Sequence, residues 1–94
     1  MARLSEGDID ERLAGSQWRR EGDAVVRDVE LRGFKSAIAF VNAVAEAAEE
    51  ANHHPDILLH GYRHVRLTLT THSAGGITEN DLALASTIDA LAAG

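Results

Sequence analysis

The feature that most constrains the fold is the alanine-rich segment GFKSAIAFVNAVAEAAEEAN, residues 33–52, which is followed by the only proline of the chain, Pro55. The spacing of its apolar residues predicts a long amphipathic helix. Proline disfavours helical geometry at the residue before it, so the helix is expected to end near Asn52. Two adjacent histidines, His53 and His54, would then lie on a loop that leaves the helix and enters a strand.

The remaining segments predict two further helices and four strands. In chain order, the expected elements are a helix in residues 4–15, two strands in 16–31, the long helix, a short and a long strand in 54–72, and a last helix in 73–94. The expected turns lie at residues 21–23 and near 60–61, so that the long strand begins at about Tyr62. This α-β-β-α-β-β-α order predicts an α+β fold in one domain over residues 1–94, with a four-stranded antiparallel sheet and the helices packed on one face.

Both outer helices carry start signals. Ser5 with Asp8, and Thr78 with Asp81, have the three-residue spacing of N-terminal capping pairs. Asp81 is therefore expected in the first turn of the last helix.

Composition limits both the core and the partners. The chain has 94 residues, of which 45% are hydrophobic but only 4% are aromatic. Much of the apolar content is alanine, so the core is thin and a partner subunit would add to its stability. The net charge of −6 argues against direct nucleic-acid binding, which requires clustered Lys and Arg. The absence of cysteine excludes disulfides, a thiolate nucleophile and cysteine-based zinc sites.

The sequence contains no recognisable targeting or membrane segment. Its first residues, MARLSEGDIDERL, lack the apolar core of a signal peptide, and no apolar run approaches membrane-spanning length. A soluble cytoplasmic protein that makes no membrane contact is therefore expected.

The long helix carries more apolar surface than one sheet contact requires. Its expected core face consists of Phe34, Ile38, Val41, Ala45 and Ala48. A second apolar flank consists of Phe40, Val44, Ala47 and Ala51. This flank either belongs to a broad core face or mediates self-association, and the thin core favours self-association.

The two adjacent histidines have three possible explanations: a solvated cap that interacts with the helix dipole, a metal site, or a pair of proton carriers. Zinc is disfavoured, because neighbouring extended side chains point apart and no close-range ligand pair such as HxxxH is present. Glu49 lies four residues before His53 and is expected on the same side of the last helical turn. His72, which is expected to close the long strand, and Asp81 can meet this helix exit at one edge of the sheet.

Imidazoles around one pocket suit an elimination reaction. Neutral imidazole accepts a proton and imidazolium donates one near neutral pH, so a set of rings can remove one proton and deliver another. Carboxylates on the remote ring nitrogens would steady the rings. The serines and threonines lie in expected caps, turns and strand faces without a glycine elbow, which indicates catalysis without a covalent intermediate.

These residues resemble the signature of the pterin-4a-carbinolamine dehydratases, and the similarity extends over residues 17–91. The matching positions are Glu49, His53, His54, Pro55, Tyr62, His72 and Asp81. The resemblance implies a hydro-lyase that dehydrates 4a-hydroxytetrahydrobiopterin to quinonoid dihydropterin and water in tetrahydropterin recycling. It also implies an α+β fold, assembly as a homodimer or homotetramer, a small-molecule pterin substrate, and no metal or added cofactor.

The resemblance further implies a role for each matched residue. His53 and His72 match the histidines that transfer protons at the 4a-hydroxyl and at N5, and His54 matches the histidine that positions the pterin and assists, so all three are expected catalytic residues. Glu49 and Asp81 match the carboxylates that keep the site in order.

Three further positions concern the wall of the pocket. Pro55, which follows the histidines, is assigned with the carboxylates to substrate binding or orientation. Trp18 falls where the family has an aromatic residue near the pocket. Ile57 stands where animal members often carry tryptophan, so the resemblance leaves that part of the wall open.

A second hypothesis is that the chain has the fold of the family but does not catalyse its reaction. Animal members of the family also bind a transcription factor and stabilise its dimer, so the chain could be a non-catalytic interaction module. The apolar flank around Phe40, Val44 and Ala47 is the surface that such a module would use. A third hypothesis is a broader pterin or molybdopterin-related role, in which a 4a-adduct would be a poor substrate.

Overall fold

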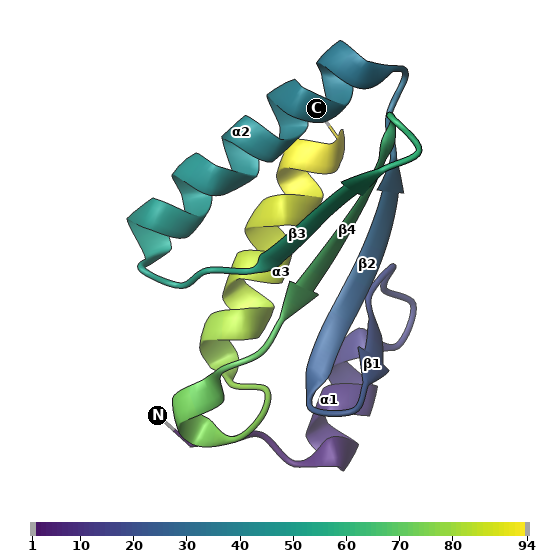
Figure 1. The fold of residues 1–94 in the computed structure, drawn as a ribbon. Helices are drawn as coiled ribbons and strands as arrows, with labels where there is room; N and C mark the ends of the chain where they lie inside the picture. Colours follow the sequence, from purple (N-terminus) through teal and green to yellow (C-terminus); the bar gives the residue numbers. More distant parts are fainter. Residues whose placement is uncertain (1, 94) are drawn as a thin grey trace.

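The structure, a computed structural model, describes residues 2–93, and the two terminal positions of the expected domain, 1 and 94, lie outside them. The elements are α1 (Glu6–Leu13), β1 (Arg19–Glu21), β2 (Ala24–Glu30), α2 (Phe34–Ala51), β3 (Asp56–His60), β4 (His64–Leu69), the 3₁₀ helix η1 (His72–Ala74) and α3 (Glu79–Ala93). Their order confirms the predicted α-β-β-α-β-β-α arrangement and the α+β class (Figure 1).

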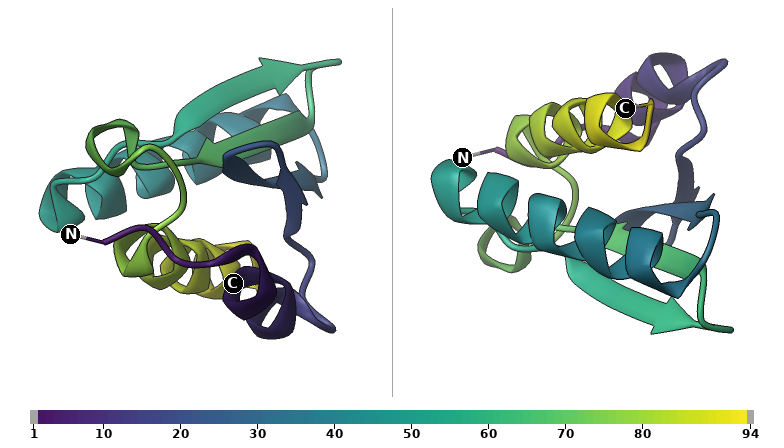
Figure 2. Two further views of the ribbon diagram at one scale, coloured as in Figure 1. Left: turned by 90° about the horizontal axis from the view of Figure 1, so that it is seen from below. Right: turned by 90° about the horizontal axis from the view of Figure 1, so that it is seen from above.

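The strands form one antiparallel sheet in the order β1-β2-β4-β3, so β3 is an edge strand. Alternation in β4 buries Val65, Leu67 and Leu69 completely, and these residues join Phe40 and Val44 of α2 in one hydrophobic core. The two long helices, α2 and α3, pack against each other on the same side of the sheet (Figure 2). α1 lies beside the β1–β2 hairpin.

The predicted end of the long helix is confirmed. α2 ends at Ala51, and Asn52 adopts a left-handed backbone with φ of 50°. The backbone N–H of His53 donates to the carbonyl oxygen of Ala48 at 3.1 Å, which reverses the chain at the helix end. Pro55 follows in the loop that enters β3.

The hairpin between β3 and β4 differs from the prediction at Tyr62. The strand β4 begins at His64 rather than at Tyr62, because Gly61 and Tyr62 both have left-handed backbones with φ of 55° and 54°. Two consecutive left-handed residues reverse the chain in a tight hairpin and cannot continue a strand. Tyr62 therefore lies exposed at the hairpin tip, at the end of β3 that is remote from the two histidines.

The end of β4 also differs from the prediction. Regular pairing stops at Leu69, and His72 begins η1 instead of closing the strand. A bridge between Thr71 and Gly76 draws the chain into a compact loop at this point. The expectation that His72 continues the alternation of the strand is therefore wrong, because the backbone leaves the extended conformation before it.

The core face of α2 differs from the predicted one. The buried stripe consists of Ala37, Phe40, Val44 and Ala48, so half of it, including its two larger side chains, comes from the flank that was expected to mediate self-association. Phe34 and Ile38, which were expected in the core, are 55% and 38% exposed. The apolar arc spans both faces, and only packing against α3 and the sheet decides which half is buried.

None of the helices within residues 2–93 is long and apolar enough to cross a membrane. A cytoplasmic location stays a prediction.

The two phenylalanines of α2 test the corrected core face. We expect Phe40→Ala to lower the free energy of unfolding by about 3–5 kcal/mol, because it leaves a cavity in the core. Phe34→Ala should change it by less than about 1 kcal/mol, since a surface substitution removes little packing. Urea denaturation of both variants at the same low protein concentration measures the difference, and equal losses would contradict the assignment.

Candidate functional site

The candidate site is built around Asp81, a carboxylate that is completely buried in the first turn of α3. Its Oδ1 lies 2.5 Å from Nε2 of His53, at the exit of α2. Its Oδ2 accepts two hydrogen bonds at 2.8 Å, from the hydroxyl of Thr71 and from the backbone N–H of Thr78. One side chain thus joins the end of α2, the segment before η1 and the start of α3.

The hydrogen bond to Asp81 determines which ring nitrogen of His53 remains available. A carboxylate only accepts hydrogen bonds, so Nε2 of His53 donates and Nδ1 is the nitrogen that can take up or release a proton. The His53 side chain is 13% exposed, so the ring is held rather than free in solvent. A histidine oriented by a carboxylate through its remote nitrogen is a common arrangement for proton transfer.

The second histidine has a different carboxylate and a different environment. Nε2 of His54 lies 2.5 Å from Oε2 of Glu49. Glu49 was expected beside His53, but the left-handed turn at Asn52 ends the helical spacing and brings His54 to it instead. The two side chains are 59% and 76% exposed, so this pair orients His54 only weakly.

The third histidine, His72, is exposed at the first position of η1. The residue before it, Thr71, bonds to Asp81, so the backbone of His72 begins one residue away from the Asp81 cluster. A cavity shared by the three rings of His53, His54 and His72 stays a prediction.

Thr71 belongs to the Asp81 cluster although no sequence pattern indicates it. Its hydroxyl lies 2.9 Å from the hydroxyl of Thr78 as well as 2.8 Å from Asp81. The one feature of the sequence that could have indicated Thr71 is its position directly before His72. A threonine at the end of a strand is common, however, and has no distinctive spacing from other site residues.

A groove of about 350 Å³ opens between α2 and α3 next to His53. Its lining combines apolar and polar side chains, namely Ala47, Glu50, Ala51, His53, Asn80, Ala83, Leu84 and Thr87. The volume lies within the roughly 300–1,000 Å³ range of small-molecule sites. His53 is the residue that connects this groove to Asp81.

Trp18 lies in the core, away from the Asp81 cluster. It is only 4% exposed, and its indole N–H donates to Oδ1 of Asp89 at 2.8 Å. The Arg27 side chain forms an ion pair with the same oxygen. Asp89 follows Asp81 by about 12 Å along α3, given the helical rise per residue. The structure therefore places Trp18 with the second half of α3.

Two further predicted positions lie on the way into β3. Pro55 and Ile57 are both half-buried, and Ile57 packs against the core. Ile57 therefore lies on the helix-facing side of the edge strand.

The start of α3 is also held from outside by an ion pair. Arg12 of α1 donates to both carboxylate oxygens of Glu79, at 2.7 Å and 3.1 Å. These hydrogen bonds lower the pKa of Glu79 and raise the pKa of Arg12. The pair is exposed, so its main effect is to align α1 with the first turn of α3.

Within residues 2–93, no group of three His, Asp or Glu side chains is arranged to hold a metal ion.

A buried carboxylate that orients a histidine beside a groove is an arrangement that also occurs in sites of proton transfer. The sequence model of the family described as "Pterin 4 alpha carbinolamine dehydratase" matches residues 2–91. The chain belongs to this family.

Individual relatives agree with the family assignment. A Thermomicrobium roseum protein, provisionally named as a pterin-4-alpha-carbinolamine dehydratase, is 54% identical over 93 residues, which cover 98% of this chain and 99% of the relative. A solved structure described as a transcriptional coactivator/pterin dehydratase from Brucella melitensis has a TM-score of 0.89 at 33% identity, covering 96% of this chain and 98% of that one.

The description of a more distant solved structure names a different role. It is described as a pterin dehydratase-like protein that acts as a RuBisCO assembly factor in the alpha-carboxysome. Its TM-score is 0.65 at 28% identity, and the match covers 80% of this chain and 86% of that one.

Substitution of Asp81 tests the central role of its carboxylate. Asp81→Ala leaves the donors of His53, Thr71 and Thr78 without their acceptor, so we expect the free energy of unfolding to fall by about 2–5 kcal/mol. Asp81→Asn retains one acceptor oxygen and should lose less. Urea denaturation measures both, with Asn80→Ala as a matched control on the exposed neighbouring position. A loss no larger than that of the control would contradict this role.

Proposed function

We propose that the protein dehydrates 4a-hydroxytetrahydrobiopterin to quinonoid dihydropterin and water, and so serves in the recycling of tetrahydropterin. The observation that carries the proposal is the Asp81–His53 pair in a chain that belongs to the pterin carbinolamine dehydratase family. The groove beside His53 has the size of a small-molecule site, and its lining includes neither His54 nor His72.

The proposed reaction is an elimination without a redox change. The C4a–O bond breaks and the hydroxyl leaves as water after it has received a proton. The N5–H bond breaks, and its electron pair forms the N5=C4a double bond. One imidazole delivers the proton to the leaving oxygen and another takes the proton from N5.

The proposal assigns these transfers to His53 and His72. Nδ1 of His53 is the working nitrogen, because its Nε2 is engaged with Asp81. His72 supplies the second imidazole from the adjacent η1, and each acid or base group would contribute roughly 10²–10⁴-fold to the rate.

His54 and Glu49 have supporting roles in this proposal. The exposed His54 imidazole, which is hydrogen-bonded to Glu49, would contact the pterin and position it. An exposed ring suits a residue that binds substrate more than one that must hold a proton at a fixed point.

A stopped-flow assay with 4a-hydroxytetrahydropterin tests the catalytic proposal. The protein should accelerate dehydration, His53→Ala and His72→Ala should each lower kcat by roughly 10²–10⁴-fold, and the double variant should approach the uncatalysed rate.

His60→Ala is the matched control, because His60 stacks on His64 at the far end of β3 and should leave kcat unchanged. Full activity of the double variant, or no acceleration by the unmodified protein, would refute the proposal.

We also propose that the chain forms a homo-oligomer. An exposed apolar stripe on α2, formed by Phe34, Ile38 and Ala45, runs beside the core face. The edge strand β3 has an unpaired side and carries Leu58, which is 52% exposed. Exposed edge strands and apolar stripes are commonly covered by another chain. The self-association surface is thus the stripe, because the flank of Phe40 and Val44 is buried in the core.

Sedimentation of two neighbouring α2 variants tests this assembly. Ile38→Glu places a charge in the stripe, so we expect it to shift the protein towards the monomer. Ala39→Glu places the same charge on the polar side of the helix and should leave the mass unchanged. Equal masses for both variants and for the unmodified protein would count against the stripe as the contact surface.

A non-catalytic interaction role is the second candidate function. The RuBisCO assembly factor has a similar fold, and the exposed α2 stripe is a surface that a foreign partner could cover. A protein that binds a partner through this stripe and leaves the dehydration rate unchanged would favour this role.

A further inference from the structure

The loop that carries His72 is closed by its own backbone at one end. Thr71 and Gly76 exchange two hydrogen bonds, with N–H to oxygen distances of 2.9 Å and 3.3 Å. Within the loop, Gly75 has a left-handed backbone with φ of 75°, and its N–H donates to the carbonyl oxygen of His72 at 3.1 Å. These bonds close the base of the loop, whereas His72, Ser73 and Gly75 within it are exposed.

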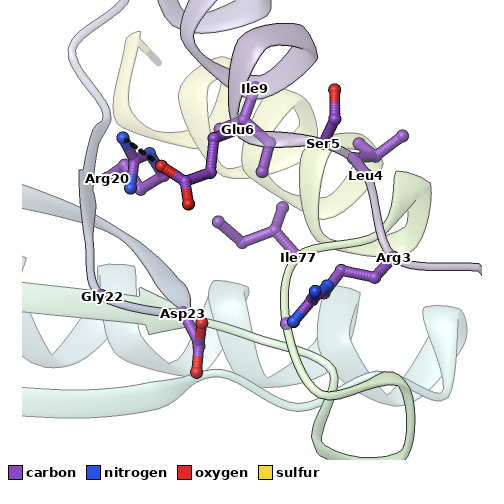
Figure 3. Close-up of a pocket in the computed structure, with 10 residues that line it drawn as sticks. Arg3, Leu4, Ser5, Glu6, Ile9, Arg20, Gly22, Asp23 and Ile77 are labelled. Atoms are coloured by element: carbon purple, nitrogen blue, oxygen red, sulfur yellow. Dashed lines mark ion pairs between the residues drawn. The ribbon is translucent and has the colours of Figure 1, made fainter.

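The segment before α1 crosses the outer side of this loop. The backbone N–H of Leu4 donates to the carbonyl oxygen of Ile77 at 2.8 Å. The guanidinium of Arg3 donates to the carbonyl oxygen of Gly75 at 3.3 Å, although the two residues are 72 positions apart. Figure 3 shows Arg3 extended along the chain that leads to Ile77.

The fit between Arg3 and Gly76 is close. A Cβ atom on Gly76 would lie 2.5 Å from Cδ and 3.0 Å from Cγ of Arg3. Gly76 is buried, and its φ lies outside the left-handed region, so its backbone does not require glycine. The absence of a side chain at this position therefore makes room for the methylene groups of Arg3.

Arg3 is also a main support on this side of the loop. A cavity of about 320 Å³ lies beside it, lined among others by Arg20, Asp23 and Ile77 (Figure 3). On this side, Arg3 contacts Gly75 and Gly76 of the loop, and Leu4 is hydrogen-bonded to Ile77, the residue that follows it.

We propose that Arg3 is a positioning residue for His72, acting as a strap that holds the Thr71–Gly76 loop through its fit on Gly76. The inference rests on the proposed function for its effect on the reaction, but the strap itself is a structural claim about the loop. A short 3₁₀ helix followed by two glycines has many accessible conformations, and an outside contact reduces them. The rate of proton transfer depends steeply on the position of the imidazole, so loss of the contact between Arg3 and the loop should lower kcat.

The test is a double-mutant cycle with Arg3→Ala, Gly76→Ala and both together. Each single substitution should lower kcat about tenfold with little change in KM, because the ring is displaced and substrate binding is retained. The double variant should be no worse than either single one, since the added methyl group enters the space that Arg3 has left. Arg3→Lys keeps most of the methylene contact and one donor, so it should retain most of the activity.

Imidazole NMR signals provide a readout that does not depend on turnover. In Arg3→Ala and in Gly76→Ala, the ring signals of His72 should shift or broaden while those of His53 remain, because Asp81 still holds His53. Arg32→Ala, at an exposed arginine before α2, is the matched control and should change neither ring.

The outcomes separate the strap from the catalytic proposal. Perturbed His72 signals in a protein that does not dehydrate the pterin would support the strap and refute the proposed reaction. Unchanged His72 signals in Arg3→Ala would overturn the strap. The strap is also overturned if the two single substitutions act multiplicatively, or if kcat falls only in proportion to the unfolded fraction measured by circular dichroism.

Discussion

The buried carboxylate of Asp81 is the interaction on which the rest of the structure depends. Burial of an ionised carboxylate is unfavourable by several kcal/mol unless hydrogen bonds replace the lost water. Here the replacements come from three separate segments, through His53, Thr71 and Thr78. The carboxylate is therefore satisfied only when the exit of α2, the end of the β4 segment and the start of α3 have come together. The same side chain completes the fold and orients the candidate proton carrier.

The two adjacent histidines differ because their carboxylates differ. His53 is bound to a buried partner and is itself mostly shielded, so its tautomer and direction are set by the protein. His54 shares its hydrogen bond with an exposed glutamate, and solvent competes for both groups. The HHP sequence thus supplies one largely shielded ring and one largely exposed ring. This division is the physical basis for assigning proton transfer to the first and substrate positioning to the second.

The candidate catalytic cluster and the candidate contact surface occupy different parts of the molecule. Asp81 and its partners lie where α2 ends and α3 begins, whereas Phe34 starts α2 at its other end. A partner that covered the Phe34 end of α2 would therefore leave the Asp81 cluster uncovered. The similar structures, one described as a transcriptional coactivator/pterin dehydratase and one as a RuBisCO assembly factor, have described roles of both kinds.

Local interactions explain which features were predictable from the sequence. The α+β order, the end of α2 at Asn52 and the capping of Thr78 by Asp81 each depend on residues within a few positions of one another. The alternation in β4 is local in the same sense, because successive side chains of a strand point to opposite faces. The resemblance to a family added the matched set of site residues, and the comparisons confirm that family.

Contacts between distant segments determined the features of the fold and of the site that the sequence did not predict. Only packing against α3 and the sheet selected Phe40 over Phe34 for the core, because the apolar arc of α2 offered both. The pairing of His53 with Asp81 joins residues 28 positions apart, and the hydrogen bond between Thr71 and Asp81 joins the end of the β4 segment to α3. The sequence by itself thus determined the elements, their order, the end of α2 and the residue types available for chemistry. The tertiary structure determined which faces are buried and which side chains meet, because long-range contacts have no fixed spacing along the chain.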